Sequence, residues 1–311
     1  MKKAVLIALF LAFASGASFA QTSIQGKTFN VRQFGAKGDN STDDTAAVAA
    51  AVSAWIASPG SVLFFPAGTY LVDPGTVTIT TNSVSIRGDG VGVSVLKNRS
   101  AGSAITLDNT SNITHSILIE NLSITGFGSG STDNGITVSG GGQEPYGLTV
   151  RRVTIGNVAG RGIYVSNNLF TSRFVDVDVS VLAAGTNGID ISGASDIALE
   201  RCYVHTVGTN GAAYRIHAGV VTLIACNGID SGTTADWMVL GDSTGTGDPT
   251  DRYARANLIG CNAEAFTNRG VYAKSGSYVN QYVGVTILAP ITGTVTPIKY
   301  DFVDTGQRGR C

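Results

Sequence analysis

Four polar residues lie on two adjacent columns of positions in three consecutive short segments in the middle of the chain. Tyr164, Asp190, Arg215 and His217 each lie where apolar and polar residues alternate. Alternate residues of a β-strand point to opposite faces, so these polar residues are expected to share the outward face. Together they predict a glycan site. They supply a carboxylate, a base, an aromatic ring and a guanidinium, which can bind a carboxylate through two hydrogen bonds. The alternative interpretation is a solvated face with an Asp–Arg ion pair.

A second set of candidates lies between these segments. Asp176 and Asp178 are two residues apart on one predicted strand, which separates their Cα atoms by roughly 6.5–7 Å. An inverting glycosidase holds its carboxyl groups about 6.5–9.5 Å apart, so this pair suits inversion. Arg201 and His205 are the binding residues expected nearby. The alternative interpretation is an outward strand face flanked by Arg152 and Arg201, with His205 as an ordinary surface residue.

The elements that must position these residues are repeated short strands. Gly135, Gly162 and Gly188 begin similar segments at intervals of 27 and 26 residues, and each segment is followed by a second alternating stretch. A fixed period of about 25 residues without a helical pattern indicates a solenoid of short strands. Charged residues make up only 14% of the chain and 40 of its 311 residues are glycine, which agrees with an all-β body rich in turns. The repeat therefore predicts a parallel β-helix.

Three cysteines fall at the same place in successive repeats. Cys202, Cys226 and Cys261 are expected to point inward, because free cysteine is among the most buried residue types. The alternative is a disulfide between neighbouring coils, which lie about 4.8 Å apart. In the earlier repeats the equivalent inward positions hold apolar residues, namely Leu122, Val153 and Val177.

The two ends of the chain are expected to lie outside the repeats. Residues 1–20 have the basic start, apolar centre and small-residue cleavage site of a secretory signal peptide. No later stretch reaches the roughly 18 apolar residues of a membrane span. The mature protein is therefore expected in the periplasm or outside the cell, with no membrane partner after cleavage. A β-helix domain is predicted over 21–303, with the cap and first coil in 21–75, and a tail over 304–311.

Composition excludes some partners and cofactors. The chain has no basic block, so nucleic acid is not an expected partner. It has no C-x-x-C pair, so a zinc site is not expected either. No cofactor or metal is predicted from the residues alone, and the oligomeric state is left open.

A run of motifs near the N-terminus carries a family resemblance. Residues 34–45 read FGAKGDNSTDDT, an amphipathic helix is predicted over 46–57, and residues 65–72 read FPAGTYLV. Together they resemble the N-terminus of the pectate lyase superfamily, which holds rhamnogalacturonase- and epimerase-like domains. The resemblance implies a right-handed, single-stranded parallel β-helix capped by that helix, and activity on a polysaccharide.

Polar residues of the cap are expected to be structural rather than catalytic. Ser41 or Thr42 is predicted to cap the helix, and Asp43 and Asp44 suit the positive end of its dipole. Asp39 is expected to shape the turn before them.

The combined prediction is a secreted enzyme that degrades or modifies a polysaccharide, by hydrolysis or elimination, on one face of a β-helix. The Gly- and Asp-rich loop 241–250 is expected to form a wall of the cleft.

The polygalacturonase motifs N-T-D, G-D-D and G-H-G are missing, so polygalacturonase chemistry is unsupported. The resemblance also allows a lyase, which would need a base, often Arg or Lys, and commonly Ca²⁺. Arg215 is the candidate base, although no cluster of calcium-binding carboxylates is visible. The alternative is a non-catalytic polysaccharide-binding or adhesive protein. The predicted catalytic residues are Asp176, Asp178, Asp190, Arg215 and His217, and the predicted substrate-binding residues are Tyr164, Arg201 and His205.

Overall fold

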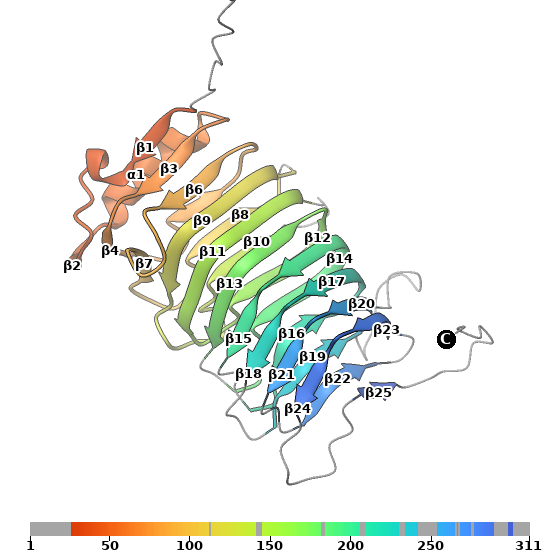
Figure 1. Ribbon diagram of the computed structural model, residues 1–311. Coiled ribbons are helices and arrows are strands. Elements are labelled where there is room, and N and C mark those ends of the chain that lie inside the picture. The colour runs from red at the N-terminus through yellow and green to blue at the C-terminus, as the bar shows by residue number, and fades with distance from the viewer. Residues whose placement is uncertain are drawn as a thin grey trace, which may run out of the picture.

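A computed structural model shows that the chain folds into an elongated parallel β-helix with one helix at its N-terminal end (Figure 1). The predicted signal peptide, the predicted tail and all but the first residue of the 241–250 loop lie outside the described residues. Those predictions therefore stay predictions. The structure describes residues 26–111, 113–140, 145–181, 184–205, 209–229, 234–241, 254–264, 266, 268–274, 277–288 and 298–300.

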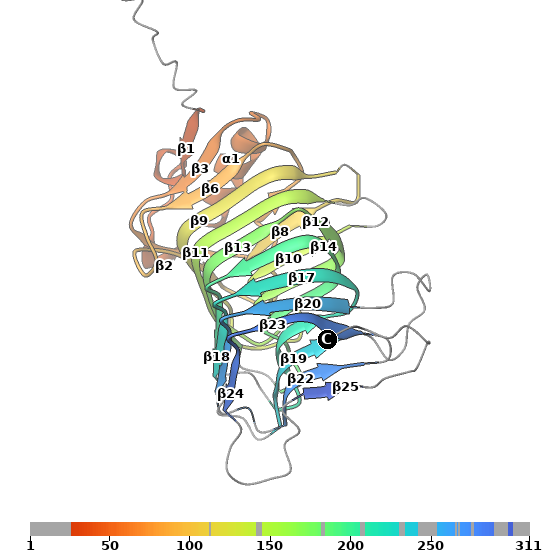
Figure 2. The same ribbon diagram turned by 45° about the vertical axis from the view of Figure 1, so that its right-hand side comes forward.

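The strands stack into three sheets, here called A, B and C, in which every pairing is parallel. Sheet A contains β1 (Thr28–Asn30), β3 (Val62–Phe65), β6 (Ser85–Gly88), the first halves of β9 (His115–Thr125), β11 (Tyr146–Val158) and β13 (Arg173–Val181), the second half of β14 (Ile189–Glu200), β17 (Gly219–Ile224), β20 (Ala254–Ile259) and β23 (Tyr278–Val283). In Figure 2, β17, β20 and β23 follow one another along this face.

Sheets B and C are built in the same way. Sheet B contains β2 (Asp39–Asp43), β4 (Gly68–Val72), β7 (Ser94–Asn98), the second halves of β9, β11 and β13, β15 (Tyr203–His205), β18 (Asn227–Ile229), β21 (Asn262–Glu264) and β24 (Thr286–Leu288). Sheet C contains β5 (Val77–Ile79), β8 (Ile105–Asp108), β10 (Ile136–Ser139), β12 (Ile163–Phe170), the first half of β14, β16 (Ala212–Ile216), β19 (Asp236–Leu240), β22 (Arg269–Ala273) and β25 (Ile298–Tyr300).

From β9 onward, the corner between sheets A and B is made by a single residue on each coil. That residue has a positive φ, which turns the chain sharply between two extended segments. The strands β9, β11 and β13 pass through this corner without ending, because the residues on both sides remain paired with neighbouring coils. The corner residues are Asn121, Arg152, Asp176, Arg201, Ala225, Gly260 and Gly284.

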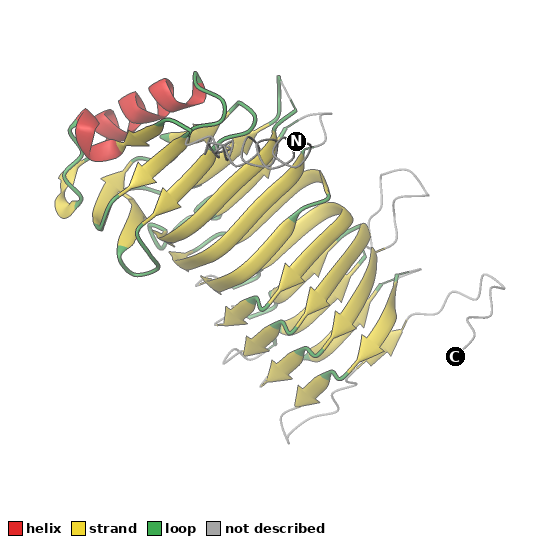
Figure 3. Ribbon diagram, turned by 45° about the horizontal axis from the view of Figure 1, so that its top comes forward, coloured by secondary structure: helices red, strands yellow, loops and turns green. Residues whose placement is uncertain are grey.

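The helix α1 (Thr45–Ile56) covers the open end of the β-helix (Figure 3). The helix lies between β2 and β3 in the chain, which is the place that a strand of sheet C takes in later coils. It packs against β5, the first strand of sheet C. Its buried face includes Val48, Val52 and the completely buried Trp55. A solenoid exposes its core at each end, so this apolar face supplies the cover that the first coil needs.

The helix begins one residue earlier than predicted, and its cap residue differs from the prediction. Ser41 and Thr42 lie in β2, where their backbone N–H groups donate to the Asp39 carboxylate at 2.9 and 2.7 Å. These hydrogen bonds hold the pKa of Asp39 well below its ordinary value. Asp44 is the N-cap residue, but its carboxylate accepts from the N–H groups of Lys37 and Gly38 at 2.6 and 3.0 Å. The aspartates thus shape the cap, as their predicted structural role requires.

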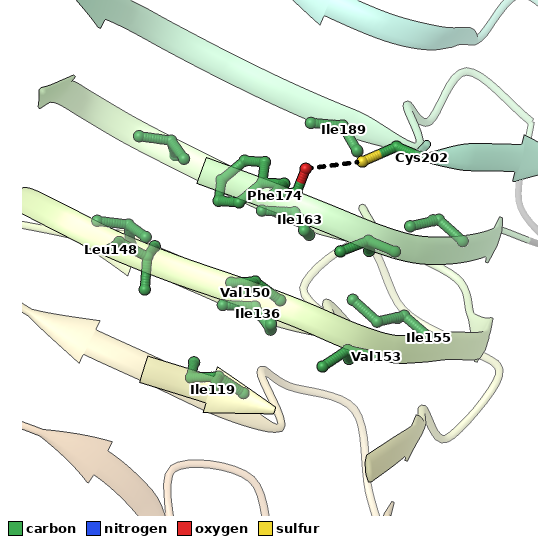
Figure 4. Packing of buried hydrophobic residues seen from close by; sticks show 14 of the residues in the cluster. Ile119, Ile136, Leu148, Val150, Val153, Ile155, Ile163, Phe174, Ile189 and Cys202 are labelled. Atoms are coloured by element: carbon green, nitrogen blue, oxygen red, sulfur yellow. Dashed lines mark hydrogen bonds between the residues drawn. The ribbon is translucent and has the colours of Figure 1, made fainter. Parts of the chain in front are cut away.

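The interior is a continuous column of aliphatic side chains, and the predicted cysteine ladder is part of it (Figure 4). Cys202, Cys226 and Cys261 are all buried free thiols at the first position after the corner. Each thiol donates to a backbone carbonyl of the preceding coil, with the Cys202 Sγ 3.3 Å from the Phe174 oxygen. Burial raises the pKa of Cys226 above its ordinary value, so the ladder behaves as apolar packing. The described cysteines form no disulfide.

Among the described residues, no helix is long and apolar enough to cross a membrane.

The repeated glycines begin the strands of sheet C because no side chain fits at their positions. A Cβ on Gly162 would lie 2.1 Å from a Val179 methyl group and 2.7 Å from the Gly188 carbonyl oxygen. A Cβ on Gly188 would meet Val204 at 2.3 Å and the Ala213 carbonyl oxygen at 2.8 Å. The glycines therefore let sheet C pass close to the valines of sheet B.

We predict that Gly162→Ala lowers the free energy of unfolding by about 1–3 kcal/mol through this overpacking. Adding Val179→Ala should restore part of the loss, because it removes the methyl group that the new Cβ meets. Gly156→Ala is the control, since a Cβ there meets nothing within 4 Å. Urea unfolding of the variants measures the effect. Equal losses for Gly162→Ala and Gly156→Ala would contradict the packing account.

Candidate functional site

The structure brings four of the predicted site residues together on the outer face of sheet C. Tyr164 pairs with Asp190 on the next coil, and Asp190 pairs with Arg215 on the coil after that. His217 lies two residues beyond Arg215, and its backbone N–H donates to the Ile191 carbonyl oxygen at 2.9 Å. The predicted column is thus confirmed in its register. It extends through Thr137 and Thr106 to Thr78 on one side, and through Val239 to Tyr272 on the other.

Asp190 is the centre of this group. It is only 2% exposed, and its carboxylate accepts three hydrogen bonds. Arg161 Nε and Asn187 Nδ2 each lie 2.7 Å from Oδ2, and His217 Nε2 lies 2.8 Å from Oδ1. Burial alone would raise the pKa of Asp190, but the hydrogen bonds from His217, Asn187 and Arg161 outweigh it, and the pKa lies below its ordinary value. Asp190 is therefore a fixed anion that orients three neighbours.

The contact with Asp190 sets the chemistry of His217. An ionised carboxylate can only accept a hydrogen bond, so His217 Nε2 is the donor. In the neutral ring, Nδ1 then carries the lone pair, and it is the nitrogen that can take up a proton. A proton gained at Nδ1 produces an imidazolium that faces the Asp190 anion. The side chain of His217 is 28% exposed, so solvent or a ligand can reach it.

A pocket of about 300 Å³ continues from this group toward the C-terminal coils. It shares Asn187 and Arg215 with the Asp190 group. Arg269 lines this pocket and forms an ion pair with the buried Asp236. Its Nε and Nη2 atoms donate to Asp236 Oδ1 and Oδ2 at 2.9 and 2.7 Å. Burial alone would lower the pKa of Arg269, but the contact with Asp236 outweighs it and raises the pKa. The remaining lining residues with ionisable side chains are Tyr272 and Lys274.

The sequence interpretation missed several members of this surface, although one motif could have found them. Residues 161–164 read RGIY and residues 269–272 read RGVY, and both occur at the start of a sheet C strand. In each the arginine lies over the tyrosine ring, at 4.2 Å for Arg161 and 3.5 Å for Arg269. Each arginine also contacts a buried aspartate on a neighbouring coil. The repeated R-G-[IV]-Y motif thus marks two equivalent cationic, aromatic positions on one face.

The second predicted group lies elsewhere, at the A–B corner and on sheet B. Asp176 is itself a corner residue with φ 53°, so it does not occupy an alternate position of one flat strand face with Asp178. Arg201 contacts Asp176 at 2.6 and 3.1 Å, and this contact lowers the pKa of Asp176. His205 Nε2 lies 2.9 Å from Asp178 Oδ1. The flat-strand geometry behind the inverting pair was therefore wrong, and the catalytic role of the pair stays a prediction.

A further acidic residue that the sequence interpretation missed is Glu120, at the end of sheet A. It is 6% exposed, although it occupies an outward strand position. Arg151 Nη2 lies 2.6 Å from its carboxylate, Arg152 Nη2 3.6 Å and Arg87 Nε 3.9 Å. One carboxylate thus joins three successive coils.

Within the described part of the chain, no three His, Cys, Asp or Glu side chains gather as a metal site would require. A Ca²⁺ requirement for a lyase therefore stays a prediction.

The parallel β-helix and its N-terminal cap are similar to those of pectate lyase-like proteins. Residues 28–116 match the family model described as rhamnogalacturonase A/epimerase, pectate lyase-like. This match confirms the resemblance found in residues 34–72. It ends before Tyr164, so every residue of the sheet C group lies outside it.

Curated relatives match only a short part of the chain. Mannuronan C5-epimerase AlgE3 of Azotobacter vinelandii is 45% identical over 75 residues, which are 22% of this chain and 4% of that protein. Alginate lyase 7 of the same organism is 40% identical over 74 residues, which are 22% of this chain and 9% of that protein. The matched segment therefore spans less than a tenth of either relative.

Solved structures share the architecture over most of the chain. ORF18 of Geobacillus virus E2 has a TM-score of 0.61 at 16% identity, covering 86% of this chain and 55% of that one. The enzymatically active domain of tailspike protein 2 from bacteriophage CBA120 has a TM-score of 0.51 at 16% identity, covering 85% and 43%. At these identities the likeness shows the parallel β-helix fold alone.

We predict that Asp190→Asn destabilises the protein at neutral pH by about 2 kcal/mol, because Arg161 and His217 lose a buried anion. The pKa of Asp190 is lowered by folding, so its contribution is present above the unfolded pKa of about 4 and is lost as the pH falls below it. Urea unfolding midpoints should therefore differ between wild type and Asp190→Asn at pH 7 and converge in acid.

Asp176→Asn is the matched control for that experiment. Its ion pair with Arg201 is exposed, so it should change stability by less than about 1 kcal/mol. A difference between wild type and Asp190→Asn that stays constant from pH 7 to pH 3 would contradict the assigned role of the Asp190 anion.

Proposed function

We propose that this protein modifies a polyuronate by removing the proton next to a uronate carboxylate, which leads to elimination or to epimerisation. The observation that carries the proposal is the pairing of buried Asp190 with His217 beside Arg215 and Tyr164 on one face. The names of the two curated relatives, an epimerase and a lyase, agree with it.

The charge of sheet C favours an anionic sugar chain. Among the described residues from 161 to 274, the outer face of sheet C and the adjoining pocket present four cations and two buried aspartates. Arginine can bind a carboxylate through two parallel hydrogen bonds, and tyrosine rings offer a surface on which sugar rings stack. Successive coils present these side chains about 4.8 Å apart along the β-helix, so an extended chain can meet several of them. The four cations are Arg161, Arg215, Arg269 and Lys274.

The proposed reaction begins with proton transfer from the uronate C5 to His217 Nδ1. The electron pair left on C5 moves into the carboxylate group, where Arg215 stabilises the developing charge. Asp190 stabilises the imidazolium formed on His217. Both elimination and epimerisation can proceed from this intermediate.

The second half of the reaction decides the product. In elimination, the electron pair forms the C4–C5 double bond, the bond from C4 to the glycosidic oxygen breaks, and that oxygen takes a proton from the Tyr164 hydroxyl. In epimerisation, a proton returns to C5 from the opposite face, and Tyr164 is the assigned donor. Tyr164 is in register with Asp190, one coil away.

Hydrolysis receives less support from the geometry. A glycosidase needs a carboxylic acid that is protonated at working pH. The pKa values of Asp190 and Asp176 are instead lowered by hydrogen bonds, which come from His217, Asn187 and Arg161 at Asp190 and from Arg201 at Asp176. Both residues therefore favour the role of a fixed anion over that of a general acid.

The cellular setting forms part of the proposal. A periplasmic or extracellular location follows from the predicted signal peptide and suits a polymer substrate. If the reaction is elimination, a Ca²⁺ requirement remains a prediction, and loss of activity on chelation with recovery on adding Ca²⁺ tests it.

A second candidate function is binding of the polymer without turnover. It is favoured by the complete pairing of Asp190, whose carboxylate accepts from three side chains as structural carboxylates do.

The experiment assays the full chain on polymannuronate, alginate and polygalacturonate. Elimination is read from the ultraviolet absorbance of unsaturated uronate, and epimerisation from deuterium uptake at C5 in D₂O. We expect His217→Ala to lower the rate by about 10²–10⁴-fold, the usual contribution of a general base. His205→Ala is the matched control, because it also removes a histidine paired with an aspartate, and its rate should stay near wild type.

Two results would oppose the proposal. Inactivity of folded wild-type protein on all three polymers, with binding retained, would favour the binding function. Activity that survives His217→Ala but is lost in His205→Ala would move the site to the A–B corner.

A further inference from the structure

A second pocket lies at the turn from sheet C to sheet A, near the N-terminal end of the β-helix. It measures about 440 Å³, within the range of small-ligand sites. Three consecutive coils contribute to it, since His115 and Tyr146 are in register and residues 80–82 precede them by one coil. Its lining residues are Thr80, Thr81, Asn82, Ile113, His115 and Tyr146.

One wall of this pocket is aromatic. The rings of His115 and Tyr146 stack with centroids 4.8 Å apart and planes only 10° from parallel. Tyr146 is also in register with Phe170 on the following coil. Tyr146 is 45% exposed and Ile113 is 40% exposed, although water contact is unfavourable for both. Both side chains thus present apolar surface to solvent at the pocket.

The opposite side of the pocket is polar, and its described lining residues include no acidic or permanently charged side chain. Thr80 and Thr81 supply hydroxyl groups, which donate and accept hydrogen bonds. The Asn82 carboxamide is fixed, because its oxygen accepts from the His115 backbone N–H at 3.0 Å. That contact leaves the carboxamide NH₂ as the donor end. An aromatic wall facing hydroxyl and amide groups matches a sugar ring, which has an apolar C–H face and a rim of hydroxyls.

This pocket differs in chemistry from the one on sheet C. The sheet C pocket is lined by Arg215, Arg269 and Lys274, whereas no Arg or Lys is among the described residues that line the second pocket. A ligand held here is therefore held by stacking and neutral hydrogen bonds rather than by its carboxylates.

We propose that the His115–Tyr146 pocket is a second glycan-binding site, which takes the uncharged face of a pyranose ring. It acts apart from the sheet C group and does not depend on catalysis there. Its role is to keep the protein on a polysaccharide.

The test measures binding of cellohexaose, mannohexaose and hexamannuronate to the full chain by isothermal titration calorimetry, with and without 0.5 M NaCl. We expect at least one probe to bind in a manner that salt leaves unchanged. Tyr146→Ala should weaken that binding at least tenfold, because it removes the ring on which the sugar stacks. His115→Ala should weaken it as well, and Tyr146→Phe should retain it.

Controls separate this site from the proposed function and from misfolding. Arg269→Ala should leave the salt-insensitive binding unchanged, and Tyr146→Ala should leave the turnover of a short uronate oligomer unchanged. Unfolding midpoints of both variants establish that they are folded. The proposal is overturned if no probe shows salt-insensitive binding, or if that binding survives in folded Tyr146→Ala. Neither result bears on proton abstraction by His217.

Discussion

Every feature of the site depends on the parallel register of successive coils. Backbone hydrogen bonds between coils fix which residues face each other, about 4.8 Å apart, even though they are some 25 residues apart in sequence. A shift of one residue would turn the outward side chains of a strand into the core. Gly162 and Gly188 keep this register by letting sheet C approach the valines of sheet B.

The register also explains why carboxylates can be buried at outward positions. Asp190, Asp236 and Glu120 are each nearly inaccessible, and each contacts an arginine from a neighbouring coil. The stack itself holds both partners, so little additional side-chain entropy is lost in joining them. At Asp190 the same arrangement orients His217, and a contact that stabilises the stack thereby fixes the tautomer that the proposed proton transfer requires.

Much of the fold could be predicted, because its signals are local and repeated. The period of the glycines, the inward column ending in Cys202, Cys226 and Cys261, and the outward column of Tyr164, Asp190 and Arg215 follow from alternation and spacing alone. The contacts of long side chains across coils could not be predicted, since Arg161 and Asn187 reach Asp190 from different strands. The flat-strand picture of Asp176 and Asp178 failed because a non-glycine residue adopts the positive φ of the corner, which alternation does not reveal.

The central claim is that a uronate chain binds over sheet C, with a carboxylate at Arg215 and a C5 proton near His217. A crystal structure of the His217→Ala variant with hexamannuronate tests it most directly, because removal of the base leaves the bound chain intact. The account predicts sugar rings along Tyr164, Arg215 and the pocket of Arg269. Sugar density at the A–B corner beside Arg201 and His205, with sheet C empty, would contradict it.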